Sequence, residues 1–253
     1  MYYNFPHLYL SQTGSTNEVA LELLSKTTPE PGFMVITDFQ TAGRGQYGRV
    51  WQSEAGSNLL ASYIFGPLDW STECLFDLHM HSIPAIHKIL FELGIHEVRI
   101  KWPNDLFVRS SKLGGILIQN LVREGVLQWT VIGLGLNVNQ AEFPAGLIAT
   151  SLFGETGIRH SVPELAAEIR EALVACFLHK QDRAELLAAY NRVLYGKDTL
   201  LHFIREDGST FQGIIRFVDA RGALVVEHLH GEMESFSFGA IRYATKPKET
   251  NES

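Results

Sequence analysis

The feature that most constrains the fold of this chain is a series of short apolar runs, separated by turns, between residues 98 and 135. Each run has the length of a β-strand and is bounded by turn-forming residues such as Gly, Pro, Asn and Asp. The pattern predicts four strands, over 98–102, 105–108, 115–123 and 127–135. Because segments with helical spacing flank them, the sequence predicts an α+β fold in which helices flank a mixed β-sheet.

Helical spacing of apolar residues occurs on both sides of this region. In the first helix, Ser15 and Glu18 have the spacing of a capping box, and the predicted helix runs to about Leu24. In the second, Pro84 predicts a kink or the junction of two helices, because proline lacks the N–H that an uninterrupted helix uses. The other elements predicted before the C-terminal part are strands at 8–12, 33–40 and 59–65, and helices at 72–93, 162–178 and 184–193.

The character of the sequence changes near Gly196, where short alternating strands separated by turns begin. These strands are predicted at 200–205, 211–218, 223–228 and 233–238. A unit of roughly 50 residues barely supports a core of its own, so we expect it to depend on the rest of the chain. The sequence therefore predicts a domain over 1–195 and a small barrel over 196–245. Residues 246–253 are polar without an apolar anchor and are predicted to form a disordered tail.

Composition excludes several classes of protein. The apolar stretch at 59–65 is far shorter than the ~20 residues that a membrane-spanning helix needs. The N-terminus has neither the basic nor the apolar segment of a secretory signal, so a cytoplasmic protein without membrane attachment is expected. The formal charge of -7 argues against a broad nucleic-acid surface, and two cysteines exclude a disulfide framework or a cysteine-rich zinc site.

A glycine-rich segment carries the first functional signal. Residues 43–48 match the pattern GxGxxG, but no helix is predicted directly after them, and the chain lacks the HRD and DFG motifs of a protein kinase. Between Phe39 and Ser53 there are two arginines, Arg44 and Arg49, and no acidic residue. Because glycine lets backbone N–H groups approach an anion closely, the segment predicts a local anion site. The alternative is a solvated glycine hairpin with two surface arginines.

Two further glycine clusters lie at strand ends in the central region. In the first, Lys101-Trp-Pro-Asn-Asp105 precedes Lys112-Leu-Gly-Gly-Ile116, so lysine, amide and carboxylate groups gather beside two glycines. In the second, Gly133-Leu-Gly-Leu-Asn137 ends a strand with an asparagine. Glycine within a strand marks a close approach of another group to the backbone. Three such clusters within about a hundred residues indicate a ligand site rather than unrelated turns.

As an ordered set, these motifs resemble those of biotin protein ligases, over residues from about 8 to 245. In order they are Ser15-Thr-Asn17, Gln40-Thr-Ala-Gly-Arg-Gly-Gln-Tyr-Gly-Arg-Val-Trp51, Lys101-Trp-Pro-Asn-Asp105, Lys112-Leu-Gly-Gly-Ile-Leu117 and Gly133-Leu-Gly-Leu-Asn137. The resemblance implies a biotin/lipoyl ligase-like catalytic domain with an SH3-like C-terminal barrel. It also implies an enzyme that uses ATP and Mg²⁺ to make biotinyl-5′-AMP and then transfers biotin to a lysine of a biotin carboxyl carrier domain of a carboxylase.

The resemblance implies three catalytic residues, Lys112, Arg44 and Asp105. Lys112 matches the lysine that contacts the reacting carboxyl and phosphate groups, where it would act as a point charge. Arg44 and Arg49 match arginines that meet carboxylate and phosphate oxygens. Asp105 matches a carboxylate near the incoming lysine amine, where it would orient the amine, accept its proton or help to hold Mg²⁺ through water.

The resemblance also implies which residues bind the substrates. Trp51 corresponds to the aromatic residue that covers adenine, and Asn137 to an amide that reads the adenine edge. The other residues matched to biotin or ATP binding are Ser15, Thr16, Asn17, Gln40, Gly43, Gly45, Lys101, Asn104, Gly114, Gly115 and Ile116. Ser15, Thr16, Gln40 and the 114–116 backbone would satisfy the polar ureido ring of biotin, which otherwise could not be buried.

Two features depart from the family pattern. Some members carry arginine where this chain has Gln46 and Tyr47, so less positive charge lies over the adenylate. The sequence also leaves no room before Leu8 for the helix-turn-helix domain of bifunctional members. A monofunctional ligase without an N-terminal DNA-binding domain is therefore expected.

Two alternative functions follow from the same residues. A lipoate or octanoate ligase has a similar domain but lacks this arginine-containing glycine segment, and the related transferases use a motif-borne cysteine that neither Cys74 nor Cys176 supplies. A non-catalytic biotin-sensing protein would not need Arg44, Asp105 and Lys112 together. The sequence leaves a homodimer open.

Overall fold

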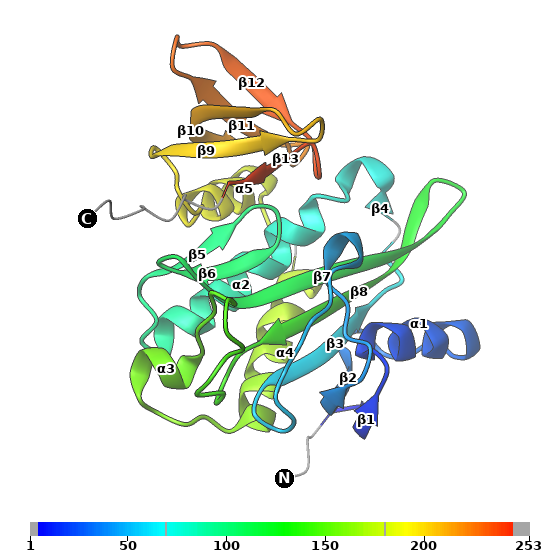
Figure 1. Cartoon of the computed structure of the whole chain (residues 1–253). Coiled ribbons are helices and arrows are strands. Elements are labelled where there is room, and N and C mark those ends of the chain that lie inside the picture. Colours follow the sequence, from blue (N-terminus) through cyan, green and yellow to red (C-terminus); the bar gives the residue numbers. More distant parts are fainter. Residues whose placement is uncertain (1–4, 69, 180, 245–253) are drawn as a thin grey trace.

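A mixed eight-stranded sheet forms the centre of the protein (Figure 1). The computed structural model describes residues 5–68, 70–179 and 181–244, so the predicted tail at 246–253 lies outside the described residues. The strand order is β1-β2-β3-β8-β7-β6-β5, with β4 paired to β8; only β1 and β2 pair in parallel. The strands are β1 His7–Thr13, β2 Phe33–Gln40, β3 Leu59–Phe65, β4 Trp70–Ser71, β5 Val98–Lys101, β6 Asp105–Val108, β7 Ser111–Arg123 and β8 Val126–Leu136.

Helices cover the two faces of this sheet unequally. On one face, Met34, Ala61 and Tyr63 pack in a large core with α2 (Asp77–Glu92) and α4 (Val162–Leu178). On the other face, α1 (Thr16–Lys26) packs over β2, β3 and the adjoining part of β8, around a small cluster that includes Val35 and Ile64. Alternate residues of a strand point to opposite faces, which is why β2 and β3 are apolar almost throughout. The predicted α+β fold, with helices on both sides of a mixed sheet, is confirmed.

Two predicted details of these helices differ from the structure: a junction of two helices at Pro84, and the capping box that starts at Ser15. Helix α2 is one element with Pro84 inside it, because Ile83 and Ile86 on either side are fully buried and packing sustains the helix through the missing hydrogen bond. Ser15 occupies the N-cap position of α1 but makes no capping bond with its side chain. The predicted partner in that capping box, Glu18, pairs instead with Arg44.

The C-terminal part forms a second, antiparallel sheet above the first (Figure 1). Its order is β12-β11-β10-β9-β13, and its strands are β9 Leu200–Arg205, β10 Thr210–Val218, β11 Leu224–His228, β12 Met233–Phe236 and β13 Ile241–Tyr243. The sequence predicted the first four of these strands and missed β13. SH3-like closure into a barrel and the boundary between 195 and 196 stay predictions.

Two smaller helices complete the fold, and the second of them lies beside the C-terminal sheet. They are α3 (Leu152–Thr156), where the sequence predicted neither helix nor strand, and α5 (Arg183–Arg192), which packs on α2 and β10. None of the helices among the described residues is long and apolar enough to cross a membrane.

The second sheet fixes the turn that follows β5. Trp102 Nε1 donates a hydrogen bond to the Gly222 carbonyl at 3.0 Å, and the Tyr190 hydroxyl donates to the Pro103 carbonyl at 2.9 Å. Phe76 lies directly on Gly222, where a Cβ would come within 2.6 Å of its ring. The C-terminal sheet and α5 therefore hold the turn at Trp102 and Pro103 in place.

Candidate functional site

A cavity of about 760 Å³ opens on the face of the sheet that α1 covers only in part. It is bounded by the start of α1, the glycine segment, the turn after β5, and the ends of β7 and β8 that face this turn. Residues 143–149 and parts of β9 and β13 complete the wall. The three glycine clusters of the sequence thus converge on one cavity, of the size of a small-molecule site.

Glycines form the floor of the cavity because other side chains press on the backbone there. At Gly133 a Cβ would lie 2.2 Å from Asn17 Oδ1, and at Gly135 it would lie 2.6 Å from the Trp51 ring. These contacts explain why β8 carries glycine at alternate positions of one face. Trp51 consequently lies flat on β8, and its Nε1 atom is buried without a hydrogen-bond partner in the described part of the chain.

The start of α1 supplies a polar end to the cavity. The N–H and hydroxyl groups of Thr16 lie 2.8 and 3.2 Å from Gln40 Oε1, and the Ser62 hydroxyl lies 2.8 Å from Thr16 Oγ1. Since the Gln40 carbonyl oxygen is occupied, its NH₂ group is the part that can donate to a ligand. The Ser15 hydroxyl, which does not cap the helix, lines the same end.

Asn17 is used within the protein itself. Its Nδ2 donates to the Leu117 carbonyl at 3.1 Å and to Gln119 Oε1 at 2.8 Å, while its Oδ1 accepts from the Ser62 hydroxyl at 2.6 Å. The residue is almost fully buried and ties α1 to β7 and β3. Asn17 therefore shapes the cavity wall through its structural bonds.

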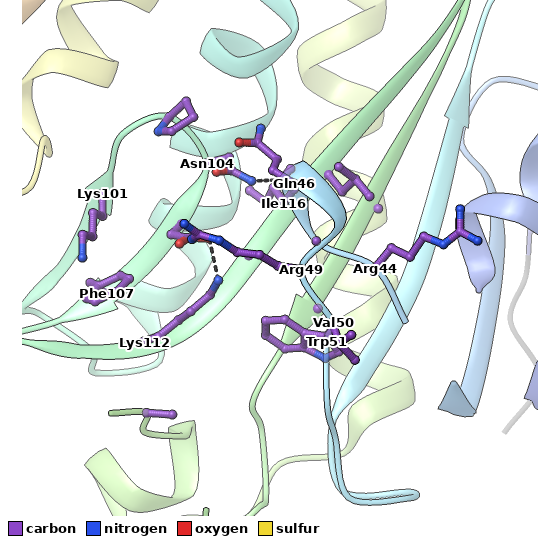
Figure 2. Close-up of a pocket in the computed structure, with 18 of the residues that line it drawn as sticks. Arg44, Gln46, Arg49, Val50, Trp51, Lys101, Asn104, Phe107, Lys112 and Ile116 are labelled. Atoms are coloured by element: carbon purple, nitrogen blue, oxygen red, sulfur yellow. Dashed lines mark hydrogen bonds and ion pairs between the residues drawn. The ribbon is translucent and has the colours of Figure 1, made fainter. Parts of the chain in front are cut away.

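The turn after β5 brings a carboxylate and a lysine into contact. Lys112 Nζ lies 2.7 Å from Asp105 Oδ1 and 5.5 Å from the centre of the Trp51 ring. Asn104 is buried, and its Nδ2 donates to the Ile116 carbonyl at 2.5 Å, so its amide holds β7 in place beside the turn (Figure 2). The structure thus brings two of the three predicted catalytic residues into direct contact.

Lys101 lies in a cage of aromatic rings. Its ammonium is 4.3 Å from the centre of the Phe107 ring, 4.8 Å from that of Tyr243 and 5.8 Å from that of Tyr195. Burial lowers the pKa of Lys101, and the Asp105 carboxylate partly offsets this. Because Tyr243 belongs to β13, this cage joins the second sheet to the rim of the cavity.

The glycine segment is a short hairpin whose two arginines point to different sides. Gly45 N–H donates to the Arg49 carbonyl at 2.7 Å, and Trp51 N–H to the Gly43 carbonyl at 2.9 Å. Figure 2 shows Arg49 extending toward Lys112, whereas Arg44 extends away from it. Arg44 lines the cavity but places its guanidinium on Glu18, so it does not join the other two predicted catalytic residues.

The remaining predicted residues have structural positions at or near the cavity. Gly115, Ile116 and Asn137 line it, and the Asn137 amide donates to the Thr150 carbonyl at 2.9 Å. Gly43 and Gly114 do not line it, but a Cβ on either would come within 3 Å of a backbone oxygen behind the wall. Glycine is required there by packing.

The cavity carries an excess of positive charge although the whole chain is acidic. Its basic lining residues are Arg44, Arg49, Lys101, Lys112, Arg205 and Arg242, and its acidic ones are Asp105 and Glu206. Such a concentration of one sign in a concave site raises the local concentration of an anionic ligand. The chemistry that fits is that of phosphates and carboxylates.

Comparison with known proteins decides the family. The model of the biotin/lipoate A/B protein ligase family matches residues 9–137, more than half of the chain. The chain belongs to this family. The bifunctional ligase/repressor BirA of Escherichia coli is 32% identical over 84% of this chain and 66% of its own length, and the biotin--[acetyl-CoA-carboxylase] ligase of Mycobacterium tuberculosis is 28% identical over 86% and 82%.

A solved structure of the family shares the whole fold. The biotin protein ligase of Aquifex aeolicus, solved with biotin and ATP, superposes with a TM-score of 0.76 over 94% of this chain and 99% of its own, at 21% identity. The covered share includes the small C-terminal sheet. The biotin ligase fold implied by the sequence motifs is therefore confirmed.

Sequence reasoning about this family member missed the wall that the C-terminal sheet supplies. Ile204, Arg205, Glu206, Arg242 and Tyr243 all line the cavity. Strand β13 has three residues, too few to show a period, so its position beside the site had no local signal. Only the tertiary packing of one sheet against the other reveals these residues.

Asp105 is the carboxylate in contact with the predicted catalytic lysine, and it was also predicted as a magnesium ligand. Its Oδ1 accepts from Lys112, and the described residues contain no group of three or more His, Cys, Asp or Glu side chains that could hold a metal ion. Mg²⁺ usually keeps several waters and takes one or two protein carboxylates together with substrate phosphates. The donor set fits an ion held mainly by a nucleotide, and the role of Asp105 toward it stays a prediction.

Proposed function

We propose that this chain is an ATP-dependent biotin protein ligase, which forms biotinyl-5′-AMP and transfers biotin to a lysine of a biotin carrier domain. The observation that carries the proposal is the single cavity in which the polar end at Thr16 and Gln40, the Lys112–Asp105 pair and Trp51 lie together. The polar end suits a ureido ring, the charged pair suits a reacting acyl-phosphate, and the aromatic ring suits adenine. The names of the related ligases from E. coli and M. tuberculosis support the same activity.

The proposed reaction has two steps because a carboxylate is a poor electrophile. In the first, a carboxylate oxygen of biotin attacks the α-phosphorus of ATP, the bond to the β-phosphate oxygen breaks, and pyrophosphate leaves. In the second, a neutral lysine amine attacks the acyl carbon, the bond to the phosphate oxygen breaks, and AMP leaves with the electron pair. The amine loses a proton in this step.

The residues of the cavity divide between these steps. We assign Lys112 to the first, where its ammonium stabilises negative charge on the carboxyl and phosphate oxygens. Arg49 adds charge from the side of the glycine segment. We assign Asp105 to the second step, where its carboxylate orients the incoming amine or accepts its proton once Lys112 has turned to the ligand.

We assign the ureido ring of biotin to one end of the cavity and the adenine of ATP to the other. Ser15, Thr16, Gln40 and the backbone at 114–116 are proposed to bind the ureido ring, whose donors and acceptor need partners when buried. Trp51 is proposed to stack on adenine, with Asn137 beside it.

The proposed macromolecular substrate is the biotin carrier domain of a carboxylase, as the name of the M. tuberculosis relative suggests. We also propose that the protein acts in the cytoplasm and without nucleic acid. Homodimer formation stays open as a part of this proposal.

Exchange of labelled pyrophosphate into ATP tests the proposed function. We expect exchange that requires Mg²⁺ and biotin and that neither lipoate nor octanoate supports, because the polar end of the cavity matches a ureido ring and not a dithiolane or an alkyl chain. Exchange with lipoate would instead favour a lipoate ligase. A folded protein that binds biotin but shows no exchange would favour a biotin-sensing protein.

A second prediction concerns the floor of the cavity under Trp51. Gly135→Ala places a methyl group about where the indole ring lies, since a Cβ there would be 2.6 Å from the ring. The ring must leave β8, and we expect ATP affinity to fall by roughly tenfold, the equivalent of one lost stacking contact. Isothermal titration with ATP measures the change.

The matched control for this variant is Gly154→Ala in α3, where a Cβ comes no closer than 3.3 Å to side-chain oxygens. It should leave ATP affinity unchanged. Equal ATP affinity in Gly135→Ala and the wild type would show that Trp51 does not contact the nucleotide.

A further inference from the structure

The guanidinium of Arg44 is held outside the centre of the site by a carboxylate on α1. Arg44 Nη2 lies 2.9 Å from Glu18 Oε1, and both side chains are well exposed, at 64% and 48%. Figure 2 shows Arg44 on the opposite side of the glycine segment from Lys112. Glu18 stands in the first turn of α1, three residues after Ser15, which lines the polar end of the cavity.

Arg44 lies between two neighbouring hollows. It lines the main cavity and also a smaller one of about 420 Å³, which Glu18, Ser15 and Gln119 line as well. The backbone of Arg44 is held by its pairing with Val50 across the hairpin, while its long side chain is well exposed and contacts Glu18. A change of side-chain rotamers alone can therefore move the charge from Glu18 toward the main cavity.

An exposed ion pair of this kind is weak and easily exchanged for a better anion. In the main cavity a carboxylate or phosphate group would meet Arg44 together with Arg49 and Lys112. A ligand that takes Arg44 must nevertheless first release it from Glu18. The apparent affinity of the ligand is lower for this reason, because only the molecules in which Arg44 has left Glu18 can bind it fully.

We propose that Glu18 is a positioning residue that competes with the ligand for Arg44, and so weakens the binding of biotin and shortens the retention of the acyl-adenylate. The inference rests on the proposed function, because it takes the anionic group to be that of biotin or its adenylate. As a consequence, this chain would bind biotin and its adenylate less tightly and release them faster. Removing the carboxylate of Glu18 should restore that affinity.

The test compares Glu18→Gln with Glu22→Gln. Glu22 lies one turn further along the same helix and pairs with Lys26 at 2.5 Å, so its substitution removes the same charge without touching Arg44. We expect Glu18→Gln to bind biotin, and a sulfamoyl analogue of biotinyl-AMP, about two- to fivefold more tightly, through slower dissociation, as suits the loss of one weak exposed pair. Glu22→Gln should match the wild type.

A double-mutant cycle separates this pair from a general effect of charge. Arg44→Ala should weaken binding of the analogue, and in that background Glu18→Gln should have no further effect. All four proteins should melt at similar temperatures, because an exposed pair adds little to stability.

Three results would overturn the proposal. They are equal affinity in Glu18→Gln and Glu22→Gln, a gain of the same size in the Arg44→Ala background, and weaker binding in Glu18→Gln. The wild-type protein separates this failure from failure of the proposed function. If it binds no biotin and exchanges no pyrophosphate, the function is wrong, whereas a binding, active protein without coupling contradicts only the role of Glu18.

Discussion

Lys112→Ala is expected to lower the rate of biotin-dependent pyrophosphate exchange by at least ~100-fold, the range seen when a preorganised charge is removed from a reacting oxygen. Lys112 Nζ contacts Asp105 at 2.7 Å and faces the Trp51 ring, so it lies beside the proposed position of adenine. The fold should survive, because the Lys112–Asp105 pair remains partly exposed and such pairs contribute little to stability. Exchange kinetics with a thermal melt of the same sample measure both effects.

Two variants make this result specific. Lys88→Ala removes an exposed lysine of α2 that does not line the cavity, and its exchange rate should equal that of the wild type. Asp105→Asn should retain exchange and lose transfer of biotin to the carrier domain, because Asp105 is assigned to the second step. Exchange by Lys112→Ala within about threefold of the wild-type rate would remove Lys112 from the chemistry.

The sequence predicted those elements best whose ends carry their own signals. Strands β2, β3 and β9 and helix α4 have the predicted bounds. In α4, the Ser161 side chain accepts from the Glu164 N–H and sets the helix start, while apolar residues at helical spacing define its buried face. Local chemistry and tertiary packing agree in these segments, so periodicity alone was sufficient.

Prediction failed where long-range packing outweighs local preference. Pro84 does not divide the segment into two helices, because the residues around it are buried in the core and α2 continues through it; a kink there stays a prediction. Strand β4 has only two residues and exists through its pairing with β8. Neither outcome has a signal in the neighbouring sequence.

The sequence could predict which residues of the motifs line the candidate site, but not which way their charged side chains point. Glycine marked the floor in advance, because only glycine lets Asn17 and Trp51 press against β8. The direction of a long charged side chain has no such signal. That Arg44 pairs with Glu18, while Lys112 pairs with Asp105, depends on contacts between segments distant in sequence.

We expect His79 to give the junction between α2 and the C-terminal sheet a strong dependence on pH. Its ring clusters with those of Phe76 and Phe238, at centre distances of 5.7 and 5.5 Å, and neither ring nitrogen has a hydrogen-bond partner among the described residues. Burial lowers the pKa of His79 from 6.5 to about 4, and the nearby Leu75 carbonyl offsets only part of this effect. The junction therefore favours the neutral ring and disfavours the protonated one.

The sign of the effect follows from proton binding in the two states. Above pH 6.5, His79 is neutral in both the folded and the unfolded protein. Between pH 6.5 and about 4, only the unfolded chain takes up the proton. The free energy of unfolding therefore falls as the pH falls through this range. The loss attributable to His79 reaches about 3 kcal/mol near pH 4.

We therefore expect the free energy of unfolding to fall by about 3 kcal/mol less in His79→Leu than in the wild type between pH 7 and pH 4. Urea unfolding at each pH measures this difference. The lowered pKa values of His81 and His87 act in the same direction but are present in both proteins and cancel in the comparison.

His230→Leu is the matched control, because it removes an exposed histidine between β11 and β12 and should keep the wild-type dependence on pH. Equal pH dependence in His79→Leu and the wild type would mean that His79 accepts its proton within the folded protein. The junction would then have to open locally on acidification, because the His79 ring is buried in the folded protein.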